Sequence, residues 1–201
     1  MKEYLEKYIK ENYKILKITC ICFIIGLVVG MILYLFVSDG IKNEFTMTLK
    51  NTLELSKSSN FENINIIKNG VISNAILLFM IYFCSITLAA PVLISMITFF
   101  KSFSIGIYIP IIFNIFGISN GLLVLLLLLI IPNILYIPAF IFSVTNAIKF
   151  HYLLFEESET SMIFKCLKEF IFVLISFSMM ILSIVVEQLL TTSVIGIYGA
   201  L

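Results

Sequence analysis

The sequence has no arginine, no tryptophan, one aspartate and one histidine, and only 12% of its 201 residues are charged. Thirteen lysines oppose twelve acidic residues, so the net charge of +1 gives no reason to expect a nucleic-acid partner. Hydrophobic residues make up 61% of the chain, and the mean hydropathy is +1.12. A chain of 22.8 kDa cannot bury that much apolar surface in its own core. We therefore expect an integral membrane protein, which excludes a soluble enzyme, a nucleic-acid binder and a disordered chain.

The scarcity of histidine and aspartate also argues against enzyme chemistry inside the membrane. A Ser–His pair needs a histidine at membrane depth, but His151 follows Lys149 at the expected membrane surface. Asp39 is the single aspartate, so there is no second one with which to share a proton. The four cysteines form no CxxC pair, and one histidine leaves a zinc site without ligands. We expect a non-enzymatic protein without a cofactor or a metal.

Long uncharged runs predict the helices that cross the bilayer. Residues 18–38 have the length of about 20 residues that one transmembrane helix needs. Residues 69–148 form a predicted transmembrane core of three segments, with Lys101 in a cytoplasmic connection between two uncharged runs. Residues 170–190 form the last predicted span. The expected fold class is an all-α, polytopic transmembrane helical bundle of about five spans, some of them kinked at proline.

Within this core, proline and glycine predict where the helices break. The run before Lys101 is too long for one straight span, so either it tilts or Pro91 breaks it. Gly117 and Gly121 predict a turn in the next run. The short segment 102–116 either crosses the membrane or re-enters it as a half-helix.

Two further prolines lie in the second half of the core. Pro132 and Pro138 each leave a backbone carbonyl that protein, rather than lipid, has to satisfy. We therefore expect this segment to be kinked and to face the interior of the bundle. The breaks at Pro91, Pro110 and Pro132 also suit a transporter built from discontinuous helices, although no inverted repeat is visible. The alternative function is therefore a membrane subunit of a small ABC-type transporter or permease.

Four polar or terminal segments lie outside the predicted spans. Residues 1–17 predict a cytoplasmic amphipathic helix, and residues 39–68 predict an extracytoplasmic loop with short amphipathic pieces. Residues 149–169 predict a cytoplasmic loop with an interfacial helix, and residues 191–201 predict an extracytoplasmic tail. Most lysines lie on the side of the N-terminus, which predicts a cytoplasmic N-terminus and an extracytoplasmic C-terminus.

Two features inside the spans are candidate contact sites. Glu187 lies roughly 26 Å along the last helix from its start, near the outer interface. It either marks the end of the helix or contacts the outer loop or a partner. Gly26 and Gly30 form a GxxxG pair, which is either a dimer interface or an ordinary occurrence of glycine in a membrane helix.

The core also carries short motifs in a recognisable order. They are Pro91, Phe100-Lys101-Ser102-Phe103 with Gly106, the turn glycines Gly117 and Gly121, Pro132-Asn133, and Pro138-Ala139-Phe140. With these motifs, five spans and a 30-residue outer loop, residues 62–150 resemble the core of the stage II sporulation protein M family. Two positions depart from that family's pattern. Ser102 stands where the pattern has glycine, and Asn133 follows Pro132 without an intervening residue.

The resemblance implies a scaffold in the plasma membrane. The family's sporulation member holds two cell-wall hydrolases, stage II sporulation protein D (a lytic transglycosylase) and protein P (an amidase and endopeptidase), at the septal membrane of the mother cell during engulfment. The expected partners of this chain are therefore those two hydrolases, the lipid bilayer and a second copy of the chain. The outer loop and Glu187 are the candidate contacts.

Overall fold

The computed structural model describes residues 2–55, 60–155 and 162–198, and nearly all of them are helical. No strand occurs in these ranges, so the predicted all-α helical bundle is confirmed. The elements in chain order are α1 (Lys2–Phe36), α2 (Asp39–Leu55), α3 (Asn60–Ser85), α4 (Ala90–Leu125), the π-helical segment η1 (Leu126–Ile130), α5 (Ile131–Phe155) and α6 (Met162–Tyr198).

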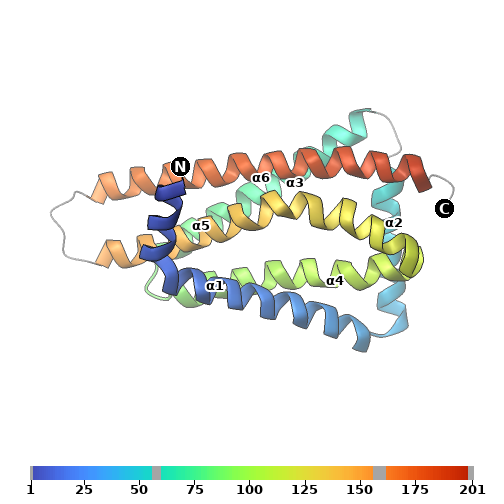
Figure 1. Ribbon diagram of the computed structural model, residues 1–201, viewed down its shortest axis with the longest axis horizontal. Helices are drawn as coiled ribbons and strands as arrows, with labels where there is room; N and C mark the ends of the chain where they lie inside the picture. The colour runs from blue at the N-terminus through green and yellow to red at the C-terminus, as the bar shows by residue number, and fades with distance from the viewer. Residues whose placement is uncertain (1, 56–59, 156–161, 199–201) are drawn as a thin grey trace.

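Five helices, α1, α3, α4, α5 and α6, run along the long axis of the molecule, and α2 lies across one end (Figure 1). Four apolar stretches of the described chain are long enough to cross a membrane. The longest, Ala90–Phe155, turns back on itself at Gly117, within the range of α4, so it passes along the bundle twice. The bundle therefore has five passes, in agreement with the prediction of about five spans.

Outward-facing apolar side chains support contact with lipid. Ile18 of α1 is 61% exposed, Phe79 of α3 is 66% exposed and Ile171 of α6 is 57% exposed. The interior instead holds fully buried side chains such as Phe140 and Met180. A soluble protein would not leave so many large apolar groups in water, so these faces are suited to a hydrocarbon environment.

The break between the second and third passes lies at Pro91 and not at Lys101. The chain turns between Ser85 and Ala90, and Pro91 occupies the first turn of α4, where its missing N–H leaves no donor unpaired. Lys101 then lies within α4. The prediction of a cytoplasmic connection at Lys101 was wrong, because a single charge does not end a helix whose backbone hydrogen bonds are complete.

The turn predicted at Gly117 is confirmed. Gly117 has φ 71° and ψ −179°, a combination that is essentially restricted to glycine. Four residues later, a Cβ at Gly121 would approach the Phe113 ring to 2.9 Å, so the chain folds back tightly there. Residues 102–116 are the second half of a helix from residue 90, about 40 Å long. They therefore belong to a complete pass and do not form a re-entrant half-helix.

The prolines of the fourth pass bend the chain as predicted. The ribbon of η1 and α5 curves along its length in Figure 1, and Pro132 and Pro138 both lie within this pass. The Asn133 side-chain amide donates a hydrogen bond to the carbonyl of Leu129 at 2.7 Å. The Ser183 hydroxyl of α6 donates to the carbonyl of Pro132 at 2.9 Å. Side chains of the protein therefore bind backbone carbonyls near Pro132, and lipid chains have no groups that could do so.

Two predicted boundaries are not breaks in the helices. The predicted surface helix and first span are joined in one helix, α1 (Lys2–Phe36), whose first part lies across the direction of the rest (Figure 1). In that first part the Tyr8 hydroxyl donates to the Asn146 side-chain oxygen at 3.0 Å, so it packs on α5. Likewise α6 begins at Met162, within the expected interfacial loop, and continues past residue 190 to Tyr198.

Candidate functional site: a charged cavity beneath α2

One face of α4 packs directly against the backbone of α1. A Cβ added at Gly26 would lie 2.6 Å from the carbonyl oxygen of Phe99, and one added at Gly30 would overlap the carbonyl of Phe103. From the other side, a Cβ at Gly106 would overlap the carbonyl of Leu27. The GxxxG pair therefore serves contact within the chain. A second copy of the chain remains a prediction, but this pair does not provide its interface.

Ser102 does not prevent this close approach, although it replaces the glycine of the family pattern. Its side chain is fully buried, and its hydroxyl donates to the carbonyl of Phe99 at 2.9 Å. The hydroxyl is thus satisfied within α4 and lies against Gly26 of α1, where an added Cβ would overlap it, so the missing side chain of Gly26 makes room for Ser102. Ser102 and Gly106 form a second small-residue pair at four-residue spacing, opposite the pair on α1.

The opposite face of α4 borders a cavity of about 540 Å³ between α3, α4, α5 and α6. Its volume lies in the range of roughly 300–1,000 Å³ that is typical of ligand sites. Polar side chains from all four helices line it, among many apolar ones. They are Ser73, Asn74, Lys101, Ser104, Tyr108, Asn133, Tyr136, Ser183, Glu187, Gln188 and Thr191.

Lys101 occupies one wall of this cavity. It lies eleven residues after Ala90, about 16 Å along α4, and therefore far from either end of the pass. Its ammonium group sits 5.1 Å from the centre of the Tyr136 ring, where the electrons of the ring face attract a cation. The hydroxyl of Tyr136 donates to the Asn74 side-chain oxygen at 3.4 Å. Lys101 is thus positioned by groups from α5 and α3.

Glu187 lines the same cavity from α6. The helix continues for eleven residues beyond it, so Glu187 does not mark a helix end as one of the two sequence interpretations had it. Its carboxylate shares the cavity with the Lys101 ammonium, but no ion pair within 4 Å joins them among the described residues. The two opposite charges therefore face each other across an open space.

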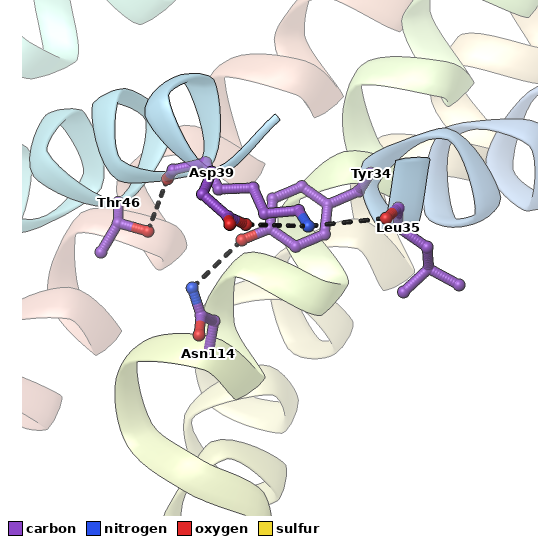
Figure 2. A network of polar contacts seen from close by, with 6 residues as sticks. Tyr34, Leu35, Asp39, Thr46 and Asn114 are labelled. Carbon is purple, nitrogen blue, oxygen red and sulfur yellow. Dashed lines mark hydrogen bonds and ion pairs between the residues drawn. The ribbon is translucent and has the colours of Figure 1, made fainter. Parts of the chain in front are cut away.

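Helix α2 covers the end of the cavity with Phe45, Thr48 and Leu49. A network of polar contacts fixes the beginning of α2 to the ends of α1 and α4 (Figure 2). The Lys42 ammonium lies 3.5 Å from the Asp39 carboxylate and 5.9 Å from the centre of the Tyr34 ring, and it also donates to the Leu35 carbonyl.

The same network reaches α4. The Asn114 side-chain amide donates to the Tyr34 hydroxyl at 3.2 Å, and Tyr34 is only 5% exposed (Figure 2). Because Asn114 is three residues before the turn at Gly117, this bond joins α1 to the end of the third pass. The predicted outer loop is therefore, over residues 39–55, a helix held against the bundle.

The cavity unites four residues that the sequence analysis selected for separate reasons: Lys101, Pro132, Asn133 and Glu187. The other selected residues lie elsewhere and serve the fold. Pro91 begins α4, Pro138 lies within α5, Gly117 and Gly121 form the turn, and Gly26, Gly30 and Gly106 join α1 to α4.

Sequence reasoning missed other residues of the cavity, although two signals for them exist. Ser183, Glu187 and Thr191 recur at four-residue steps, which places them on one face of a helix. On α4, a similar signal comes from Lys101, Ser104 and Tyr108, which are three and four residues apart and therefore share one face of the helix. The contribution of Tyr136 had no comparable signal, because an aromatic residue is common in an apolar run.

A family model described as stage II sporulation protein M matches residues 19–192. The chain belongs to the stage II sporulation protein M family. No curated protein and no solved structure matches it. The family match extends well beyond the motifs of residues 62–150, and it includes α2 together with both cavity charges, Lys101 and Glu187. The cavity therefore lies within the region that defines family membership.

Proposed function

We propose that this chain is a non-enzymatic membrane protein that anchors and organises peptidoglycan hydrolases, stage II sporulation proteins D and P, at the sporulation septum during engulfment. Membership of the family and the long apolar helices support this proposal. The lysine distribution favours a cytoplasmic N-terminus, and α2 lies at the opposite end of the bundle from the N-terminus. In that orientation α2 faces the compartment where cell-wall hydrolases act.

The observation that carries the proposal is that α2 is held as a helix across the end of the bundle. Its first turn is fixed by the Lys42 contacts, and part of it seats Phe45 against the cavity. Elsewhere on α2, Met47 is 68% exposed and Ile41 is 48% exposed. A partner would thus meet a preformed surface with two apolar side chains, and would order little chain on binding.

Substitution of the exposed apolar residues of α2 tests this proposal. We expect Ile41→Asp with Met47→Asp to abolish co-purification of co-expressed stage II sporulation proteins D and P in mild detergent. The matched control is Ile163→Asp with Phe164→Asp, since these exposed apolar residues lie on α6 near the other end of the bundle. Thermal unfolding of both variants checks that the bundle is intact. Full recovery of both hydrolases with the α2 variant would refute the role of this surface.

A second candidate function is a membrane subunit of a small ABC-type transporter or permease. The specific observation that favours it is the cavity, because it places two opposite charges between helices, as transport sites do. This function predicts that a cytoplasmic ATPase co-purifies and that a variant of the connection between α5 and α6 loses it. Recovery of wall hydrolases alone would exclude it.

A further inference from the structure

We infer that the cavity is a binding site for a zwitterionic ligand, with the ligand's anionic group at Lys101 and its ammonium group at Glu187. The site is distinct from the exposed surface of α2, and it does not depend on the proposed scaffold function. The observations that carry it are the position of the two charges, the size of the space between them and the polar groups around it.

The two charges are costly at this position unless something pairs with them. Lys101 and Glu187 lie within helices that are long and apolar enough to span a membrane, and an unpaired ionisable group there is strongly unfavourable. Direct pairing would be the simplest remedy, yet their charged groups do not come within 4 Å of each other in the described structure. A ligand with one charge of each sign would satisfy both groups at once.

The walls of the cavity keep the two charges apart. The Lys101 ammonium is held over the Tyr136 ring, and Tyr136 is itself bonded to Asn74. Behind Lys101, α4 is in backbone contact with α1 through Gly106, so the helix has no freedom to retreat. On the other wall, the Ser183 hydroxyl joins α6 to the Pro132 carbonyl. Ser183 lies four residues before Glu187 on the same helix. Because both walls are fixed, the helices cannot move together to pair the two charges directly, and a ligand that fits the gap is favoured instead.

A ligand with a single charge fits this site poorly. An anion such as phosphate would pair with Lys101 but would also face the carboxylate of Glu187. A simple ammonium ion would pair with Glu187 but would face Lys101. Like charges at short range between helices repel each other more strongly than in bulk water, so the site selects for ligands that carry both signs. The Ser104 hydroxyl donates to the Phe100 carbonyl but can still accept a hydrogen bond, and the Tyr108 hydroxyl also lines the space beside the neutral part of the ligand.

Two sources can supply this chemistry. One is the headgroup of phosphatidylethanolamine, a common membrane lipid, which carries a phosphate and an ammonium group. The other is a free zwitterion of amino-acid type that enters from the end covered by α2. The same pair of charges would hold either one, so the experiment has to separate the sources.

Ligand-dependent thermal stabilisation of the full-length chain in lipid-free detergent tests the inference. The probes are glycerophosphoethanolamine as the free headgroup, glycine as a free zwitterion, inorganic phosphate as an anion and ethylammonium as a cation. We expect at least one zwitterion to raise the unfolding temperature at a concentration about tenfold lower than phosphate or ethylammonium requires. Native mass spectrometry of the protein, released from nanodiscs of phosphatidylethanolamine or phosphatidylglycerol, then shows whether the protein retains phosphatidylethanolamine more strongly than phosphatidylglycerol.

The result assigns the source in either case. Retention of phosphatidylethanolamine with a response to its free headgroup identifies a lipid site, whereas a response to glycine without lipid retention identifies a soluble ligand. The inference is overturned if no zwitterion stabilises the wild-type protein, or if phosphate or ethylammonium alone is as effective.

Variants of the two charges test the site itself. We expect Lys101→Met and Glu187→Gln each to remove the preference for the zwitterion. The matched control is Lys149→Met with Glu11→Gln, because those side chains form an ion pair at 4.0 Å outside the cavity. The control should bind as the wild type does. Equal binding by Lys101→Met, Glu187→Gln and the wild type would overturn the assignment, and the wild-type measurement stands even if a cavity variant fails to fold.

Discussion

The two faces of α4 show two different ways of using a membrane helix. Toward α1, Ser102 and Gly106 bring backbone against backbone and leave no space. Toward α3, α5 and α6, Lys101 and Ser104 border an open, polar cavity. The tight face fixes the position of the helix, and the open face presents the charged group. Rigidity on one side is therefore what allows a space to persist on the other.

Chemical accessibility should separate the two faces most strongly. In a background in which the four native cysteines are replaced by alanine, we expect Ser104→Cys to react with a water-soluble maleimide much faster than Ser102→Cys. Ser104 is exposed on the cavity wall, whereas Ser102 is fully buried against α1. The expected ratio of labelling rates is on the order of 100, the factor set by a local opening that costs about 3 kcal/mol. Similar rates at the two positions would mean that the cavity excludes water or that the α1 contact is loose.

The tight face should be sensitive to a single methyl group. We expect Gly106→Ala to lower the free energy of unfolding by about 2 kcal/mol, because its Cβ would overlap the Leu27 carbonyl and push α1 away. Unfolding in detergent by increasing denaturant measures this change. Gly40→Ala on α2 is the control, since nothing lies within 4 Å of a Cβ there. If both variants unfold alike, close packing of α1 on α4 does not stabilise the bundle.

Substitution of the turn glycine Gly117 should lower the free energy of unfolding slightly less than Gly106→Ala does. Gly117→Ala places a side chain at φ 71° and ψ −179°, and this strain costs on the order of 1–2 kcal/mol even though no neighbouring atom lies within 4 Å. The same unfolding assay measures it. Because this site has no packing contact, its cost isolates conformational strain from the steric effect at Gly106. An unfolding curve identical to that of the wild type would contradict the turn geometry.

The smallest effect is expected at a single hydrogen bond of the cavity wall. Ser183→Ala removes the bond to the Pro132 carbonyl, which should lower the free energy of unfolding by about 0.6–1 kcal/mol. Ser178→Ala is a suitable control, since the Ser178 hydroxyl bonds only to the carbonyl of Leu174 within its own helix, on an exposed face. A loss for Ser183→Ala no larger than for Ser178→Ala would show that α6 does not depend on this contact.

Much of the fold could be predicted from the chain alone. The apolar runs predicted a helical membrane bundle with about five passes, and Gly117 predicted its turn, because hydropathy and glycine act locally. The boundaries were less predictable. Lys101 was placed in a connection since charge and chain breaks often coincide, but the chain turns before Pro91, which begins α4, and Lys101 lies within that helix. The expected surface helix at the N-terminus is continuous with the first pass, since no residue between them interrupts the hydrogen bonding.

Local sequence patterns were enough to place the chain in a membrane, to predict the turn at Gly117 and to mark Glu187 as a charge within a predicted span. They left open whether Pro91 breaks a helix, and they placed Lys101 in a connection. Only the tertiary structure decided that these two charges face each other, 86 positions apart in the chain, and that α2 covers the space between them. The reason is physical. Hydropathy and backbone preference act within one helix, whereas the direction in which a charge points depends on how that helix is rotated against its neighbours. Here that rotation is set by the contact of Gly26, Gly30 and Gly106 between α1 and α4.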